Sequence, residues 1–342
     1  MVESLNIIPI ECVNCGTEFN TDFDSVEQKI MLNCPKCGIS FHINDIYDMY
    51  YDQEPLVKKA VDLIITYAEQ RWAITNGKKG YSEAIENFLK KVDFDSLLKE
   101  ILCDVVKYGD SYLEIIRDPR TKEIIQLKPL ESKSVTIKLG KEVQRGRAYT
   151  GEREVETFIV GSGTGQRELS PTDVVHSKAR APYSYSPYGE AVMRISLKPI
   201  NYLRRSREGA LKAGAKWWVE YLEDEISLGI GVPRIFLEKN YSVKYSKPVV
   251  EIASTYFIGS ARNAQTPITS SFEGQLFGQV LGEKDFREIP RLEFQKIYSN
   301  KILRNGGYDF SKETKALKEL LDAEVISQEE YQRILAEFYG KS

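Results

Sequence analysis

Apolar positions along the first third of the chain recur with the period of a helix. Between residues 54 and 67 they fall three and four positions apart, so that one face of a helix carries them. A second stretch of this kind begins near residue 81 and continues to Gly109. Glycine directly after the last apolar position is a common helix end, because it adopts a positive φ without strain. These segments predict a helical layer early in the fold.

The period changes to that of β-strands after Gly109. Two β-branched runs in residues 111–130 flank Asp118 and Pro119, a turn with proline where a type I turn accepts it. Further strands are expected at 134–140, 156–163 and 174–179, with polar or glycine-rich breaks at 140–153 and 161–168. This middle section predicts a mixed α/β layer of short antiparallel strands.

Helical character returns over residues 187–228. We expect one long segment there, with kinks at Pro199, Gly209 and Gly214. The remaining expected elements are a strand at 231–238, a helix at 248–260, a polar loop at 261–267, a helix at 271–282, a strand at 290–297 and a helical hairpin at 312–340. The whole pattern is that of an α+β protein.

Length and composition describe a globular protein of more than one unit. A chain of 342 residues favours two to four domains, and 42% hydrophobic with 28% charged residues is an ordinary balance. The net charge of -3 gives no overall basic footprint for tight phosphate binding. No run of eighteen apolar residues occurs, and the first residues lack the pattern of a signal peptide. We therefore expect no membrane partner.

The sharpest chemical signal is two C-x-x-C pairs near the N-terminus. Cys12 and Cys15 form the first pair, Cys34 and Cys37 the second, and eighteen residues separate them. Two such pairs close a tetrahedral shell of four thiolates, which is typical of structural zinc and leaves no position open for catalysis. The alternative, redox motifs of the thioredoxin type, requires a βαβ context that the pattern lacks. His42 lies nearby, but four cysteines already fill the shell.

No catalytic constellation emerges from the sequence. The chain has two histidines, and it contains neither a Walker-type phosphate loop nor a G-x-S-x-G motif. His176 follows a β run and is interpreted as a structural residue at a strand end. Cys103 lies among apolar positions and is interpreted as a small buried side chain. We therefore do not expect an enzyme.

Three segments in a fixed order resemble the portal proteins of tailed viruses. Residues 104–138 are similar to the portal wing, where a helix ending in a Gly-Asp pair leads into a hairpin and a strand. Residues 169–211 are similar to the strand, loop and helix start that lead into the portal stem. Residues 317–335 are similar to the helices of the portal crown. Each motif is weak alone, and their order carries the resemblance.

The resemblance implies a division of the chain. After the zinc ribbon at 1–46, which the cysteine pairs predict, it gives a wing α/β domain at 47–186, stem helices with a reduced clip at 187–285, and a wing strand with a helical crown at 286–342. Two features depart from the family. Portals are usually longer, and little sequence remains between Leu228 and Ile268 for a clip. An N-terminal zinc ribbon is not a general portal feature, and it is interpreted as an added contact to capsid or scaffold.

The resemblance also implies a function without chemistry. A portal is a ring, typically of about twelve subunits, at one capsid vertex, through which a terminase ATPase drives double-stranded DNA. The implied partners are other copies of this chain, double-stranded DNA, the terminase, the major capsid protein and a head–tail adaptor. The implied location is the virion, assembled in the host cytoplasm. A nearly neutral chain agrees with a channel that must let DNA slide.

DNA-channel candidates follow from the same resemblance. Arg204 and Arg205 lie on the expected long stem helix, where they would meet the next subunit or DNA. A tunnel loop is expected at 259–267, and its polar candidates are Arg262, Asn263 and Gln265. The second choice for this loop is 238–247, with Lys239 and Lys244, if the turn at Gly231 ends the second stem helix. An ordinary surface loop is the simpler alternative at 259–267.

Two other functions remain open on the sequence. One is a zinc-ribbon protein that binds nucleic acid or a transcription complex. The acidic loop between the two cysteine pairs disfavours phosphate binding by the ribbon itself. The other is a hydrolase with an unrecognised pair of acids. A large ring in solution would favour the portal, and a monomer would favour the other two.

Overall fold

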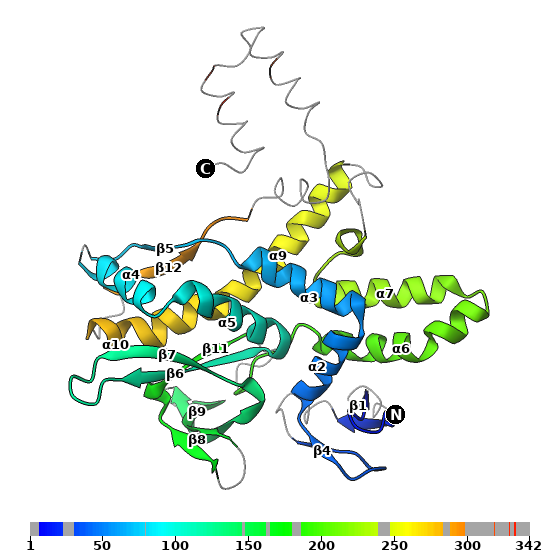
Figure 1. Cartoon of the computed structure of the whole chain (residues 1–342), viewed down its shortest axis with the longest axis horizontal. Coiled ribbons are helices and arrows are strands. Elements are labelled where there is room, and N and C mark those ends of the chain that lie inside the picture. The colour runs from blue at the N-terminus through cyan, green and yellow to red at the C-terminus, as the bar shows by residue number, and fades with distance from the viewer. Residues whose placement is uncertain are drawn as a thin grey trace.

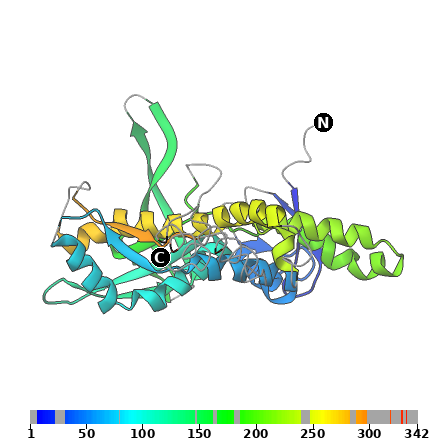
Figure 2. The same ribbon diagram turned by 90° about the horizontal axis from the view of Figure 1, so that it is seen from above.

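The computed structural model describes residues 7–22, 31–78, 80–145, 148–161, 165–179, 186–238, 247–282 and 288–297, together with Lys318, Gln328 and Gln332. These residues form a mixed helix and strand structure whose elements lie in a broad, flat layer (Figures 1 and 2). The predicted α+β class is confirmed. In the part of the chain that is described, no helix is both long and apolar enough to cross a membrane. The expected C-terminal hairpin at 312–340 lies almost wholly outside the described residues.

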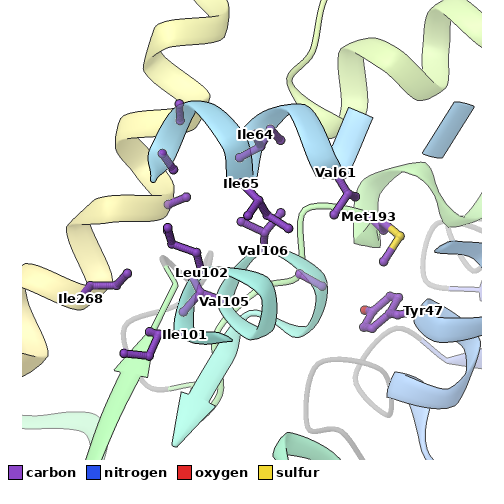
Figure 3. Close-up of a cluster of buried hydrophobic side chains, with 14 of the residues drawn as sticks. Tyr47, Val61, Ile64, Ile65, Ile101, Leu102, Val105, Val106, Met193 and Ile268 are labelled. Atoms are coloured by element: carbon purple, nitrogen blue, oxygen red, sulfur yellow. The ribbon is translucent and has the colours of Figure 1, made fainter. Parts of the chain in front are cut away.

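The centre of the molecule is a cluster of helices. Helix α3 (Pro55–Ala68) packs against α5 (Phe94–Tyr108) and against the long helix α9 (Lys247–Ser271). Figure 3 shows Ile65 and Val106 meeting where α3 crosses α5, and Ile268 of α9 on the side of Leu102 and Ile101. These side chains are buried because the apolar positions repeat on one face of each helix.

Two further helices surround this cluster. Helix α2 (Ile43–Gln53) was not expected from the sequence, and His42 caps it with a reciprocal capping box. Helix α4 (Tyr81–Lys91) is separate from α5, because Asp93 takes a left-handed φ of 53° between them. The predicted helix end at Gly109 is confirmed, with a φ of 83°.

Three small antiparallel sheets make up the strand part of the body. The first joins β6 (Asp110–Arg117), β7 (Ile124–Leu130) and β11 (Val174–Lys178) in the order β11-β6-β7. The second joins β8 (Val135–Arg145), β9 (Ala148–Val160) and β10 (Arg167–Leu169). The third pairs β5 (Trp72–Thr75) with β12 (Arg291–Phe294). The antiparallel strands predicted for the middle section are confirmed.

The β8–β9 hairpin projects from the flat layer (Figure 2). It is longer than the sequence pattern predicted, because the expected break at 140–153 is mostly strand. Only Phe158, Ile159 and Val160 of β9 pair with β10. Within the described residues, the outer part of the hairpin therefore has no third strand beside it.

The expected long helix at 187–228 is wrong. A 3-10 turn, η4 (Arg194–Ser196), is followed by two antiparallel helices, α6 (Leu197–Lys212) and α7 (Lys216–Ile230), which pack on each other (Figure 1). The chain reverses at Gly214, whose φ of 73° is one that glycine adopts without strain. Beyond α7, the expected strand is a 3-10 turn, η5 (Arg234–Leu237).

The expected tunnel loop at 259–267 is also wrong. Those residues lie inside α9, which continues into a π-helical segment, η6 (Phe272–Phe277), and then into α10 (Gly278–Leu281). Phe257, Ala261 and Ile268 keep the helical spacing of buried positions through this stretch. Pro267 removes one backbone donor without ending the helix.

Candidate metal centre and the ribbon–hairpin contact

The two cysteine pairs lie in two matching turns. The first turn follows β1 (Ile7–Glu11) and leads to β2 (Glu18–Asp22), while the second lies between β3 (Leu32–Asn33) and β4 (Ser40–Phe41). In each turn the glycine after the second cysteine donates its N–H to the carbonyl of the first cysteine, at 2.9 and 3.0 Å. Gly16 and Gly38 have φ values of 65° and 71°, which explains why glycine stands there.

The four sulfur atoms converge on one point. The Sγ atoms of Cys12 and Cys37 are 3.6 Å apart, those of Cys15 and Cys34 are 3.7 Å apart, and all four lie within 4.8 Å of one another. A tetrahedral ion with Zn–S bonds of about 2.3 Å requires sulfur atoms about 3.8 Å apart. The donor set therefore fits a metal ion that prefers four thiolates.

The surroundings of the sulfurs favour thiolates on one side of the cluster. The Thr17 hydroxyl lies 3.3 Å from the Cys15 sulfur and lowers the pKa of that thiol to about 6. The backbone N–H of Ile39 lowers the pKa of the Cys37 thiol. His42 is not part of the cluster, because its Nδ1 accepts the backbone N–H of Asn44 at 3.1 Å.

The ribbon that carries the cysteines shares its core with the body. Ile10, Leu32 and Phe41 are at most 4% exposed, and they belong to the same buried cluster as Tyr50 of α2 and Ile200 of α6. Strand β1 contacts α6 directly. The ribbon is therefore packed against the helices and does not stand apart from them.

Arg204 on α6 links the ribbon to the helices by charge. Its guanidinium lies 3.2 Å from a carboxylate oxygen of Glu11 in β1 and 3.4 Å from one of Glu54. It also lies over the ring of Tyr50, 5.3 Å from the ring centre. The Arg204 side chain is 16% exposed and that of Glu54 is 7% exposed, so this ion pair is largely removed from water.

Arg205 and Arg207 extend this interaction on both sides. Arg205 forms an ion pair with Glu18 of β2, and Arg207 lies 3.4 Å from Glu54. We call the set of Arg204, Arg205, Arg207, Glu11, Glu18 and Glu54 the arginine clasp. The resemblance to portal proteins implied that Arg204 and Arg205 would meet a neighbouring subunit or DNA. Their side chains instead contact the chain's own ribbon, and a DNA role for them stays a prediction.

The other DNA-channel candidates are dispersed. Arg262 and Asn263 are exposed on α9. Gln265 is buried, and its amide Nε2 donates to the carbonyl of Ala68 at 2.8 Å, so it serves the packing of α9 on α3. Lys239 and Lys244 lie outside the described residues. The assignment of these residues to a DNA channel stays a prediction.

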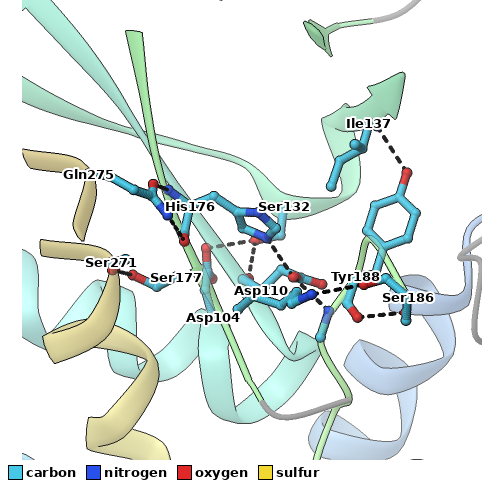
Figure 4. Close-up of polar contacts among 12 residues, drawn as sticks. Asp104, Asp110, Ser132, Ile137, His176, Ser177, Ser186, Tyr188, Ser271 and Gln275 are labelled. Carbon is cyan, nitrogen blue, oxygen red and sulfur yellow. Dashed lines mark hydrogen bonds and ion pairs between the residues drawn. The ribbon is translucent and has the colours of Figure 1, made fainter. Parts of the chain in front are cut away.

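His176 belongs to a largely buried polar network (Figure 4). Its Nε2 lies 2.7 Å from Asp110 Oδ1, and the same oxygen accepts the backbone N–H of Gly189 at 2.8 Å. The backbone N–H of His176 donates to Gln275 Oε1 at 2.8 Å, and Gln275 Nε2 donates to the His176 carbonyl at 3.2 Å. Tyr112 stacks on the imidazole ring. The network joins β6, β11 and η6, as expected of a structural histidine.

The Gly189 backbone in this network is unusually close to its neighbour. A Cβ atom at Gly189 would lie 1.9 Å from the carbonyl oxygen of Gly109, so only glycine fits. The sequence signal for this network was the Gly109-Asp110 pair after α5. Nothing local in the sequence showed that residue 189 would pack against it.

A small open cleft of about 220 Å³ lies between the ribbon and α6. Glu11, Glu18, Arg204, Arg205 and Asn201 line it, and the arginines and acids form ion pairs across it. It contains neither a cysteine nor a histidine. The arrangement is that of two packed elements, without a nucleophile and base in reach of each other.

No family model matches the sequence, and no curated protein matches it. Solved structures do match over nearly the whole chain. A chain in the virion of a native gene transfer agent particle has a TM-score of 0.56 at 12% identity, over 90% of this chain and 95% of that one. A chain in the neck of the native particle, computed with C12 symmetry, has 0.52 at 12% identity, over 90% and 95%. A chain in the neck of the empty particle, computed with C6 symmetry, has 0.53 at 12% identity, over 89% and 94%. At this identity the likeness shows a shared fold.

Proposed function

We propose that this chain is a structural subunit of a phage-like particle, and within that particle the portal protein. The observation that carries the proposal is the fold, which it shares over 90% of its length with a chain of a virion and of its neck. The order of wing-like and stem-like motifs in the sequence points independently to the same class. A structural role also agrees with the packed, non-catalytic character of the described His176 network.

In this proposal the subunits form a ring that surrounds double-stranded DNA at one capsid vertex. Neck structures computed with C12 and C6 symmetry support a cyclic assembly. A closed ring requires heterologous contacts, in which two different faces of each subunit meet. A terminase ATPase, the major capsid protein and a head–tail adaptor are the further partners, and the virion is the location. The chain itself performs no chemistry.

The α6–α7 hairpin takes the place of the stem, and the reversal at Gly214 takes the place of the clip. Helix α7 ends at Ile230 and α9 begins at Lys247, so the second choice for the DNA-facing segment, at 238–247, is the one we retain. Its cations are Lys247, at the start of α9, and the two candidates Lys239 and Lys244. Replacing both with alanine should lower the salt slope of DNA affinity by about one unit for each phosphate that the lysines no longer neutralise.

The metal of the ribbon is proposed to be zinc in a purely structural role. The sulfur spacing and a shell already filled by four thiolates support this assignment. The competing function, a zinc ribbon that binds nucleic acid, has less support because Glu11 and Glu18 of the ribbon contact arginines of α6.

Light scattering on the purified protein tests the proposal. A ring of twelve subunits has a mass of about 470 kDa, twelve times 39.1 kDa. Negative-stain images of the same fraction should show rings with a central channel. A protein that stays at the mass of one chain at every concentration, with and without DNA, contradicts the proposal.

A further inference from the structure

Helix α7 carries large apolar side chains on its exposed side. Trp217, Tyr221 and Leu228 are 68%, 49% and 55% exposed. At about 100° per residue, these three positions lie within about 40° of one another around the helix axis. The buried positions Val219 and Ile226 lie on the opposite side. We call Trp217, Tyr221 and Leu228 the α7 stripe. Exposed apolar side chains grouped in this way mark a contact surface.

Helix α6 has an exposed stripe of a different character. Lys198, Tyr202 and Gly209 lie within about 40° of one another, again opposite the buried face of their helix. We call these residues the α6 stripe. Gly209 has no local reason to be glycine, because a Cβ atom there would meet no atom within 4 Å. Glycine is also among the least favourable residues in a helix interior. A partner that approaches the backbone closely would explain it.

The two stripes complement each other in shape and charge. The α7 stripe offers a large indole, and the α6 stripe offers the gap above Gly209. Exposed Glu225 lies beside the α7 stripe, while Lys198 belongs to the α6 stripe. Because the two helices are antiparallel and joined at 213–215, Gly209 lies within about one helical turn of the level of Trp217, and Tyr202 lies within about one turn of the level of Glu225. Hairpins standing side by side would bring these pairs together. The Lys198 ammonium, which lies 6.0 Å from the centre of the Tyr202 ring, would then come near Glu225.

We propose that the α7 stripe of one copy packs on the α6 stripe of the next copy, with Trp217 seated over Gly209. The inference rests on the proposed ring, and it names the faces that meet in its stem. The interface is heterologous, so each copy uses one stripe on each side and the ring can close. The occupant is a second copy because both complementary halves lie on the same hairpin.

Gly209→Leu is the central test, measured by mass photometry over a concentration series. The variant should fold like the wild type by circular dichroism and should need at least about tenfold higher concentration to assemble. Gly274→Leu is the matched control, because Gly274 is also exposed and also has no atom within 4 Å of an added Cβ. It lies at the far end of the molecule, in η6, and should assemble normally.

Two compensating pairs identify the partner residue. Adding Trp217→Ala to Gly209→Leu should recover part of the assembly, because the space taken by leucine is returned. Lys198→Glu should weaken assembly about tenfold, and adding Glu225→Lys should restore it. A structural role within one chain would show neither recovery.

Each outcome separates this inference from the proposed function. A wild-type protein that never assembles overturns both. If Gly209→Leu forms the ring as well as the wild type does, the pairing of the two stripes is wrong. The portal proposal is not affected by that result. Equal weakening in the Gly274→Leu control, or weakening without recovery in both double variants, also overturns the pairing.

Discussion

Within the arginine clasp, we predict that Arg204 is the side chain that holds the ribbon against the helices. The variant Arg204→Met keeps an apolar stem and removes the guanidinium. It leaves Glu54, which is 7% exposed, with one fewer cation, and burial already raises the pKa of that carboxyl. Removing one partner of a fully buried pair costs about 3–5 kcal/mol. Here Arg207 remains 3.4 Å from Glu54, so we expect the free energy of unfolding to fall by about 2–3 kcal/mol.

Urea unfolding followed by circular dichroism measures this change. Lys212→Met is the matched control, since Lys212 is a cation on the same helix whose side chain is 81% exposed and pairs only weakly with Glu208. This variant should change the free energy of unfolding by less than about 0.5 kcal/mol.

A double-mutant cycle isolates the charge. In a Glu54→Gln background the buried carboxylate is gone, so Arg204→Met should cost less than about 1 kcal/mol. The reasoning fails if Arg204→Met behaves like the Lys212 control, or if it costs the same in both backgrounds. The first result would mean that the ribbon is held by apolar packing alone, and the second would mean that Arg204 does not act through Glu54 and that its pair with Glu11 carries the effect.

Three further predictions concern the metal, a buried acid and a close backbone approach. Metal analysis should find about one zinc per chain, and Cys34→Ser should abolish it and raise hydrogen exchange in the ribbon and, through the shared core, in α2 and α6, but not in β6. Burial raises the pKa of Asp104 from its ordinary value of 3.8 to about 6, so the native state loses stability as the pH rises from about 4 to about 6, and the full penalty is present above that range. Asp104→Asn should therefore stabilise the protein by at most about 3 kcal/mol near pH 8, and the gain should vanish below about pH 4 in thermal melts. Gly189→Ala should destabilise the fold by about 3 kcal/mol or more, because its Cβ would lie 1.9 Å from the Gly109 carbonyl oxygen, and a neutral result in the same melts would contradict the packing.

Local chemistry made the cysteine turns and the turn between β6 and β7 predictable. The C-x-x-C-G pattern encodes both the ligands and the positive φ at Gly16 and Gly38. The turn at Asp118 was predictable for a similar reason, because its carboxylate accepts two backbone N–H groups at 2.8 Å. In these places a few neighbouring residues determine the conformation.

The expectations from the sequence were wrong where contacts between residues far apart in the sequence determine the conformation. Pro267 and a polar stretch favour a loop at 259–267, but the buried face of α9 against α3 and α5 outweighs the one missing backbone bond. Arg204 and Arg205 resemble free helix charges, because Glu11 and Glu18 lie nearly two hundred residues away in the sequence. The chain reverses at Gly214 where a kink was predicted, since glycine alone does not distinguish a bend from a turn.

The projecting β8–β9 hairpin has a consequence for subunits that have not yet assembled. Among the described residues its outer part has no neighbouring strand, and an unpaired strand edge is a template for any extended chain. Lys138 and Glu156, 3.5 Å apart near the base of the hairpin, are the kind of charged pair that discourages such pairing, and the sequence places further charged residues in the outer part. Whether a free subunit assembles or aggregates therefore depends on its concentration. At high concentration, or after slow synthesis of its partners, disordered edge-to-edge aggregation competes with productive assembly.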